Sequence, residues 1–328
     1  MNILITGASG SMAHYLAQRI KESSPSSAII GIGRRKFFEW GSLFSAYFSV
    51  DLSHKINCSV LKLWFERNAI DVVFHLAAMA NVRDSFRNPD AAIANNVNST
   101  LYLFEALRCA DTGKALRYAD IGKPKVILAS TSEVYGDVPL ANNPIVEDQP
   151  FAPVNPYAIS KCTQELIAWH YSEAYGIPLV VMRAFGYINP RRSDLVATAV
   201  AKQIVDGERS SEPIIVRHGN LSPIRSFCDA RDIAMAYWMA AKNCDSGVYN
   251  IGSAKPVSIA GLVQALSALT LAAHPVLLEA DDSLRRPTDI GRCIPNINRF
   301  YSVTGWTPTI GLVESLDWLM AALRSESK

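Results

Sequence analysis

Short apolar runs alternate along the chain with longer stretches in which apolar residues recur at helical spacing. The apolar runs are bounded by turn residues and occupy 2–6, 28–32, 47–50, 71–76, 125–130 and 179–183. Helical spacing is clearest at 12–20, 91–108 and 156–175. Alternation of this kind is typical of a parallel sheet with helices on both faces. The pattern therefore predicts an α/β fold built on a doubly wound parallel sheet.

The rhythm changes after residue 183. Connecting segments become longer and richer in Pro, Arg and Asn, and one further strand-like run returns at 248–251. We therefore predict that 1–184, together with about 227–251, form the sheet domain, and that 185–226 and 252–328 form a smaller C-terminal lobe. Because ligands of doubly wound sheets bind beyond the carboxyl ends of the strands, this lobe is expected to hold a substrate there.

Composition and charge exclude several classes of protein. The chain has 328 residues, of which 49% are hydrophobic, so it can bury a large core. Its net charge of +2 is too balanced to predict nucleic-acid binding. The most apolar stretch, 261–278, is interrupted by Gln264, His274 and Pro275, which argues against a membrane span. An apolar strand that begins at Asn2 leaves no room for a cleavable leader, so a cytoplasmic protein is expected.

Cysteine usage points to a reducing compartment. The six cysteines are scattered, without a CxxC pair or a histidine at zinc-like spacing. They are predicted to be buried, reduced thiols, with no disulfide and no bound metal.

A glycine-containing turn follows the first predicted strand in TGASGSMA, residues 6–13. Gly7 permits a tight turn, Gly10 lets the backbone approach an anion, and the small Ala13 lets the next helix pack on its strand. The free N–H groups at the helix start, around Ser11 and Met12, favour a negative charge. The turn is a candidate pyrophosphate site of Rossmann type, and a purely structural turn is the alternative.

Candidate catalytic residues lie in LASTSEVYG, residues 128–136, and NPYAISK, residues 155–161. Tyr157 and Lys161 are four apart just inside a predicted helix, so both project from one face. A nearby ammonium stabilises a tyrosinate, which would let Tyr157 exchange a proton near neutral pH. Thr131 ends a strand and can hydrogen-bond the same substrate oxygen. These groups suit the interconversion of an alcohol and a ketone beside a nicotinamide cofactor, whereas an ordinary surface pair is the alternative.

The second predicted strand ends in GIGRRK, residues 31–36, which contains no acidic residue. A carboxylate here would hold the ribose hydroxyls of NAD(H), whereas Arg34 and Arg35 would pair with the 2′-phosphate of NADP(H). NADP(H) is therefore favoured over NAD(H). A solvated basic loop is the alternative interpretation of both arginines.

Together with DL at 51–52, FHLAA at 74–78 and NNVNSTL at 95–101, these motifs resemble those of the extended short-chain dehydrogenases/reductases, the nucleotide-sugar epimerase/dehydratase group. The resemblance runs from residue 1 to about residue 318. It implies a catalytic triad of Thr131, Tyr157 and Lys161. It also implies further cofactor-binding residues: Asp51 at the adenine, Leu52, Ala77, Ala78 and Asn95.

Two segments of the second lobe, 217–238 and 285–290, resemble the GDP-mannose branch of this family. That branch comprises the GDP-mannose 4,6-dehydratases and the reductases of their 4-keto-6-deoxy product, so a GDP-linked sugar is the implied substrate. By this resemblance Arg225 and Arg286 would clamp the diphosphate and Asp289 would hold a ribose hydroxyl. For each arginine a surface ion pair is the alternative. The remaining candidates for substrate binding are Asn189 and Arg192, both in YINPRR.

Other features of the sequence point to different reactions. Glu133 matches the dehydratase base that takes the C5 proton, and a spectator carboxylate is the alternative. VRDSF at 82–86 and the short segment 36–50 instead resemble the reductases. We therefore favour reduction of the C4 keto group of a GDP-4-keto-6-deoxyhexose over a 4,6-dehydratase, a 4-epimerase or a non-catalytic NADP-sensing protein. Gly186 stands where the family usually places an asparagine, so an altered hexose is a further alternative.

The helices predicted at 91–108 and 156–175 carry apolar residues beyond one stripe, including Trp169 and Tyr171. In the family that the chain resembles, the matching helices form a four-helix bundle between two subunits. A homodimer is therefore expected, and simple packing into the core is the alternative.

Overall fold

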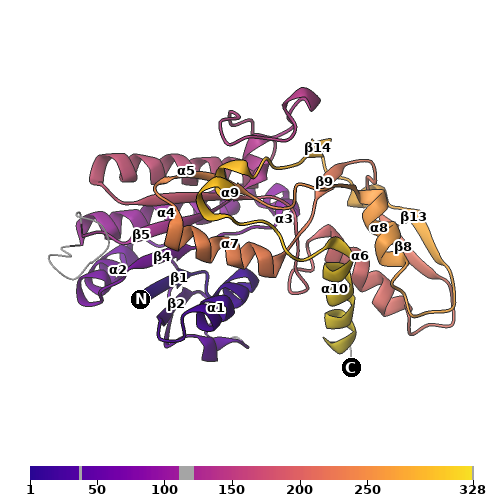
Figure 1. Ribbon diagram of the computed structural model, residues 1–328, viewed down its shortest axis with the longest axis horizontal. Coiled ribbons are helices and arrows are strands. Elements are labelled where there is room, and N and C mark those ends of the chain that lie inside the picture. Colours follow the sequence, from indigo (N-terminus) through magenta and orange to yellow (C-terminus); the bar gives the residue numbers. More distant parts are fainter. Residues whose placement is uncertain (37–38, 111–121, 327–328) are drawn as a thin grey trace.

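The computed structural model describes residues 1–36, 39–110 and 122–326, and its largest feature within them is a seven-stranded, fully parallel sheet (Figure 1). Its strands, in spatial order, are β3 (Ala46–Ser49), β2 (Ala28–Gly33), β1 (Asn2–Thr6), β4 (Val72–His75), β5 (Lys125–Thr131), β6 (Leu179–Ala184) and β11 (Gly247–Ile251). The chain starts near the centre, runs to one edge, and then returns to build the other half. This is a doubly wound, Rossmann-like order, so the predicted fold class is confirmed.

Two layers of helices cover the sheet and enclose two cores. They are α1 (Ser11–Ser23) and α7 (Ala230–Asn243) on one face, and α2 (Ile56–Arg67), α4 (Pro89–Cys109) and α5 (Pro156–Tyr175) on the other (Figure 1). Ile3 and Ile5 of β1 belong to the first core, and Leu4 between them belongs to the second. Successive side chains of a strand point to opposite faces, so a strand buried on both sides is apolar throughout. This explains the unbroken apolar runs in the sequence.

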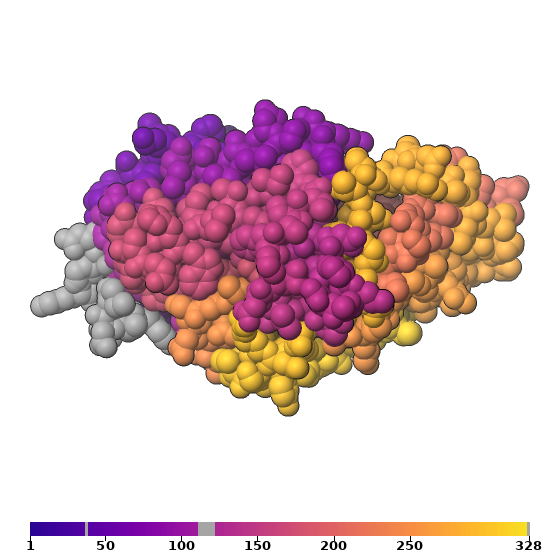
Figure 2. Space-filling model, turned by 90° about the horizontal axis from the view of Figure 1, so that it is seen from above, coloured from indigo at the N-terminus to yellow at the C-terminus, as the bar shows by residue number. Residues whose placement is uncertain are grey.

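The second lobe has a core of its own, in which Ile204, Leu262 and Leu319 are completely buried. Its orange and yellow segments form the right end of the molecule in Figure 2. Its main elements are α6 (Val196–Gly207), α8 (Ile259–Ser267), α10 (Leu312–Glu326), the parallel pair β8 (Ile214–His218) and β13 (Val276–Ala280), and the small sheet of β12 (Pro256–Ser258), β9 (Ile224–Ser226) and β14 (Arg292–Cys293). The chain also returns to the sheet, because Phe300 and Trp306 pack in the core beneath α7.

Shorter elements connect these parts. They are α3 (Val82–Arg87), α9 (Asn298–Thr304), the paired β7 (Tyr187–Ile188) and β10 (Cys228–Asp229), and the 3-10 turns η1 (Gly41–Leu43), η2 (Ser132–Tyr135), η3 (Leu140–Asn142) and η4 (Asp282–Leu284). Across the described parts of the chain, no helix combines the length and the apolar character needed to cross a bilayer. The six cysteines are free thiols; four are buried as predicted, but Cys58 is only partly buried and Cys109 is exposed.

Candidate active site

The glycine turn joins β1 to α1 at the carboxyl edge of the sheet. Gly7 has a φ of +67°, and a Cβ there would lie 2.8 Å from the backbone nitrogen of Ala77, so only glycine fits. The N–H of Gly10 donates to the carbonyl of Gly7 at 2.8 Å. α1 begins at the next residue with no side-chain hydrogen bond from its cap. A helix start of this kind presents backbone N–H groups to an anion.

A cavity of about 250 Å³ opens beside this turn, between the ends of β1, β2 and β4. Ser9 and Gly33 are neighbours in its lining, where a Cβ on Gly33 would lie 3.3 Å from the hydroxyl of Ser9. Ser11 and Met12 belong to the first turn of α1 and are not part of the cavity lining. The predicted cofactor residues that line the cavity are Gly7, Gly10, Arg34, Arg35, Asp51, Leu52, Ala77, Ala78 and Asn95.

Charged groups stand at one side of this cavity. Arg34 follows the end of β2 and donates from Nη1 to the side-chain oxygen of Asn95 at 3.3 Å. Partial burial raises the pKa of Asp51, but hydrogen bonds from Ser53 and the charge of Arg34 outweigh it and leave that pKa lowered. A glycine cradle, an ionised carboxylate and two arginines in one cavity fit a nicotinamide dinucleotide.

The candidate catalytic side chains come from the end of β5 and the start of α5. Asn155 caps α5 by accepting a hydrogen bond from the N–H of Ala158 at 2.8 Å, and Pro156 occupies the first helical position. Tyr157 is therefore held in the first turn of the helix and hydrogen-bonds Thr131, the last residue of β5. Lys161 lies one turn later and is likewise buried.

Burial dominates the ionisation of both groups. It raises the pKa of Tyr157, against the smaller lowering effects of Arg192 and Thr131. Burial also lowers the pKa of Lys161 to about 8, and the charge of Glu165 offsets part of this. The ammonium of Lys161 donates to the carbonyl of Ala129 at 2.5 Å. In this structure burial therefore outweighs the effects that lower the pKa of Tyr157, and the lowering of that pKa by Lys161 stays a prediction.

A buried ion pair connects α5, the helix that carries Tyr157 and Lys161, to the neighbouring strand β6. Arg183 of β6 donates to Glu165 from Nε and Nη2, the latter at 2.7 Å, and both side chains are almost fully buried. Ser130 also hydrogen-bonds Glu165, and Tyr135 accepts a hydrogen bond from Arg183 at 2.9 Å. The pair ties β6 to the helix that carries Tyr157.

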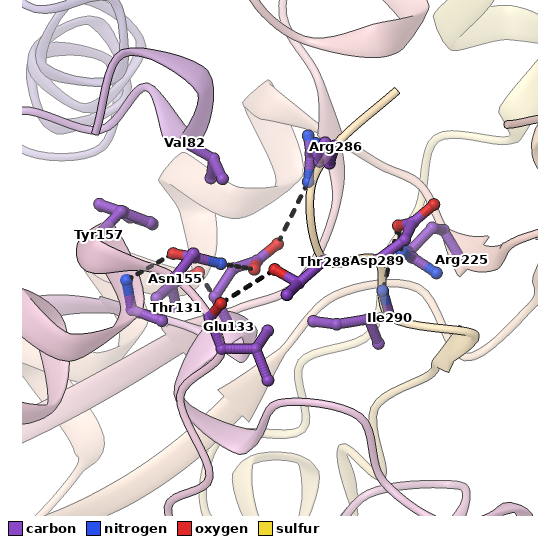
Figure 3. Close-up of polar contacts among 12 residues, drawn as sticks. Val82, Thr131, Glu133, Asn155, Tyr157, Arg225, Arg286, Thr288, Asp289 and Ile290 are labelled. Carbon is purple, nitrogen blue, oxygen red and sulfur yellow. Dashed lines mark hydrogen bonds and ion pairs between the residues drawn. The ribbon is translucent and has the colours of Figure 1, made fainter. Parts of the chain in front are cut away.

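Glu133 stands beside Thr131 at the start of η2 and is contacted from two sides (Figure 3). The amide of Asn155 donates to Oε2 at 2.8 Å. The guanidinium of Arg286 lies 3.9 Å from Oε1. The structure thus brings Glu133 together with Thr131 and Tyr157, and adds one of the two arginines implied for the diphosphate.

The other predicted substrate residues contact acids or other parts of the chain. Arg225 is paired with Asp289 at 3.2 Å, and this pair lies to one side of Arg286 in Figure 3. Arg192 forms a two-pronged pair with Asp194, each contact being 2.6 Å. Asn189 is completely buried, and its amide donates to the hydroxyl of Ser11 in the glycine turn at 3.0 Å. Its position ties the second lobe to the glycine turn and does not expose its side chain to a substrate.

Gly186 has a structural explanation. A Cβ at this position would lie 2.5 Å from the carbonyl oxygen of Ser226, which is backbone and cannot swing away. The Gly186 carbonyl also accepts a hydrogen bond from the N–H of Cys228 at 3.0 Å, in the pairing of β7 with β10. The departure from the family's asparagine is thus matched by a close approach of two backbones.

Two polar residues near the site escaped the sequence reasoning. Asn155 both caps α5 and holds Glu133, and its place before a proline is a recognisable capping signal. His75, at the end of β4, lies between the hydroxyls of Thr6 and Thr100 at 2.8 and 3.0 Å. Burial lowers the pKa of His75 to about 3, so the imidazole is a neutral bridge. No local pattern marks such a bridge, because both of its partners are distant in sequence.

Comparison with known proteins adds a family to this geometry. The model of the family described as GDP-mannose 4,6 dehydratase matches residues 4–317. GDP-6-deoxy-D-mannose reductase from Pseudomonas aeruginosa is 29% identical over 255 residues, which cover 76% of this chain and 80% of that one. UDP-glucuronate 4-epimerase from Thermodesulfobacterium geofontis is 31% identical over 226 residues, which cover 68% of this chain and 63% of that one.

Solved structures share the fold along the whole chain. UDP-glucose 4-epimerase from Thermotoga maritima, solved with UDP-glucose, superposes with a TM-score of 0.84 at 22% identity and covers 100% of both chains. RMD from Pseudomonas aeruginosa, complexed with NADPH, superposes with a TM-score of 0.82 at 24% identity and covers 99% of both chains. At such identities the likeness speaks for the fold alone.

Proposed function

This chain belongs to the GDP-mannose 4,6-dehydratase family of extended short-chain dehydrogenases/reductases, and it is therefore an NAD(P)-dependent nucleotide-sugar enzyme. From this premise we propose that it reduces a 4-keto sugar. The proposed substrate is a GDP-4-keto-6-deoxyhexose and the proposed cofactor is NADPH. The observation that carries the proposal is the meeting of Thr131 and Tyr157 where β5 ends and α5 begins (Figure 3), in a chain that is 29% identical over 255 residues to a GDP-6-deoxy-D-mannose reductase. A protonated tyrosine beside a hydroxyl can donate its proton to a ketone oxygen, and burial, which raises the pKa of Tyr157, keeps that proton in place at neutral pH.

The residues have separate roles in this reduction. Tyr157 would donate its phenolic proton to the C4 oxygen while Thr131, already hydrogen-bonded to Tyr157, orients that oxygen. Lys161 would hold the nicotinamide ribose, because its ammonium is buried one turn from Tyr157 on the same helix. When bound, NADPH supplies the hydride that completes the reduction at C4. Catalysis then rests on positioning and on one matched proton transfer.

The NADPH preference rests on the cavity beside the glycine turn. Arg34 and Arg35 line it, and β2 ends without an acidic residue that would favour a ribose diol. The residues proposed to hold the cofactor are Gly7, Gly10, Ser11, Met12, Arg34, Arg35, Asp51, Leu52, Ala77, Ala78, Asn95, Tyr157 and Lys161. We further propose that 1–184 with 227–251 form the cofactor unit and that 185–226 with 252–328 form the substrate lobe.

For the substrate lobe, the proposal assigns Arg225 and Arg286 to the diphosphate and Asp289 to a ribose hydroxyl. Asn189 and Arg192 would act indirectly, by joining the lobe to the glycine turn and by lowering the pKa of Tyr157. The proposed guanine base is supported by the likeness to GDP-6-deoxy-D-mannose reductase and not by a contact within the chain.

A direct assay tests the reaction. Purified protein is mixed with GDP-4-keto-6-deoxymannose and NADPH, and the expected result is NADPH consumption with a product heavier by two hydrogens. Tyr157→Phe should lower kcat by about 10²- to 10⁴-fold. Tyr301→Phe, which changes an exposed tyrosine of α9, is the matched control. Full turnover by Tyr157→Phe would remove Tyr157 from the mechanism.

A 4,6-dehydratase is the second candidate, and the position of Glu133 favours it. Its carboxylate is held by Asn155 beside Thr131 and Tyr157, where it could take a proton from the sugar (Figure 3). Loss of water from GDP-mannose in the presence of NADP⁺ would establish this reaction in place of the reductase.

We also propose a homodimer through α4 and α5. Ile159 and Leu166 lie two turns apart on α5 and are 42% and 60% exposed, which is high for apolar side chains on one stripe. Leu166→Glu should give a monomer, whereas Leu140→Glu, at an exposed leucine in η3, should leave the mass unchanged. A monomeric mass for the unmodified protein would refute the proposal.

A further inference from the structure

The carboxylate of Glu133 has two partners that come from different parts of the chain (Figure 3). Asn155, at the start of α5, donates to Oε2 at 2.8 Å. Arg286, in the second lobe, approaches Oε1 to 3.9 Å. Each oxygen therefore has its own neighbour, and one can be lost without the other.

These two partners are held with different firmness. Asn155 is buried, and its side-chain oxygen is fixed as the cap of α5 by the N–H of Ala158 at 2.8 Å. Arg286 is 43% exposed and its contact with Glu133 is long for an ion pair. Asn155 therefore fixes the carboxylate, whereas the guanidinium of Arg286 is free to exchange one anion for another at low cost.

The guanidinium group binds carboxylates and phosphates with the same planar set of donors. A nucleotide diphosphate brought to the second lobe therefore competes with Glu133 for Arg286. Resting on the proposed function, we propose that Arg286 is shared between two anions: it pairs with Glu133 until the diphosphate of the nucleotide sugar takes it over.

The exchange has a direct consequence for the site. Once Arg286 turns to the diphosphate, Oε1 of Glu133 is uncovered, while Oε2 stays on Asn155 and the carboxylate keeps its orientation. Binding of the diphosphate thus exposes one oxygen of Glu133 to the sugar that the diphosphate carries. Arg286 acts here as a positioning residue for Glu133 and as a binding residue for the diphosphate.

The competition predicts that one substitution in the site increases the affinity for GDP. Glu133→Gln keeps an oxygen that can accept from Asn155 but removes the charge that competes for Arg286. GDP should therefore bind Glu133→Gln about two- to fivefold more tightly than the unmodified protein, the range that separates a weak ion pair from none. Arg286→Gln should bind GDP more weakly, and the double variant should bind like Arg286→Gln alone.

Calorimetric titration of GDP and of UDP into the four proteins measures this, with thermal unfolding to verify that each variant is folded. Asp282→Asn is the matched control, because it also removes one negative charge near Arg286. The arginine that this variant releases is Arg285, which pairs with Asp282 at 3.0 Å, and not Arg286. This variant should bind GDP like the unmodified protein. Equal tightening by Asp282→Asn would attribute the effect to net charge and overturn the proposal.

The remaining outcomes are also decisive. Unchanged or weaker GDP binding by Glu133→Gln overturns the shared arginine. The same tightening in the Arg286→Gln background also overturns it, since simple repulsion between Glu133 and the diphosphate would then be the cause. If UDP binds and GDP does not, the proposed GDP substrate is wrong. The competition for Arg286 is then tested by the same comparison of variants with UDP. Binding of neither diphosphate to the unmodified protein overturns both.

Discussion

Lys161 offers a test of how the fold treats a buried charge. Its side chain is buried on α5, and burial lowers its pKa from 10.5 to about 8. Lys161→Met keeps the length of the side chain and removes the ammonium. The variant also leaves the carbonyl of Ala129 without this donor, but that cost does not depend on pH.

The magnitude follows from linkage. The pKa of Lys161 is lowered in the folded state, so between about pH 8 and 10.5 the unfolded chain binds more protons and stability rises with pH. A pKa lowered from 10.5 to about 8 costs about 3 kcal/mol of stability at pH 7. Most of this cost, about 2–3 kcal/mol, is recovered by pH 10, where the ammonium has lost its proton in the folded state and has begun to lose it in the unfolded chain. Lys161→Met has no ammonium to titrate, so its stability shows no such recovery with rising pH.

Urea unfolding at pH 7, 8, 9 and 10 measures the prediction. The free energy of unfolding of the unmodified protein, relative to Lys161→Met, should rise by about 2–3 kcal/mol across this series. Lys202→Met, at an exposed lysine of α6, controls for the loss of a surface lysine and should track the unmodified protein. A difference between Lys161→Met and the unmodified protein that stays constant within about 0.5 kcal/mol would refute the reasoning.

Three further predictions concern the cofactor, the lobe junction and the buried pair. Arg34→Ala should raise the KM for NADPH about ten- to hundredfold with little change for NADH, as measured in steady-state assays; equal changes would remove the arginine from 2′-phosphate recognition. Gly186→Asn should destabilise the protein by at least about 1–3 kcal/mol in urea unfolding, because its Cβ would lie 2.5 Å from a backbone carbonyl. Gly41→Ala, where nothing lies within 4 Å, should be neutral. Glu165→Gln should cost about 3–5 kcal/mol by leaving a buried guanidinium uncompensated, and a loss under about 1 kcal/mol would contradict that account.

Much of the fold follows from signals that act over a few residues. In the run Asn2–Thr6 the buried residues Ile3, Leu4 and Ile5 are apolar because β1 faces a core on each side, and the glycine that follows is needed for a positive φ. The start of the helix that carries Tyr157 can be recognised from two neighbouring residues: Asn155 is its N-cap, and the proline that follows takes the first helical position. Period, turn geometry and capping are local, so they can be recognised along the chain before any contact is known.

The contacts of the substrate lobe could not be predicted from such local signals. Arg286 was singled out by resemblance for a diphosphate, and the structure sets it against Glu133, which stands in the other half of the chain. From the sequence, Gly186 reads as a lost polar contact, whereas in the structure the carbonyl of Ser226 leaves no space for a side chain there. Neither pairing has a sequence spacing that could reveal it.

The ionisation of the site shows the same division most clearly. Tyr157 and Lys161 were recognisable from their spacing, and α5 does carry both. Their spacing nevertheless suggested that the lysine lowers the pKa of the tyrosine, whereas burial raises the pKa of Tyr157 and lowers that of Lys161. The identity and order of the chemical groups are written along the chain, but their charge depends on how much water the surrounding segments exclude. That quantity exists only after segments distant in sequence have packed together.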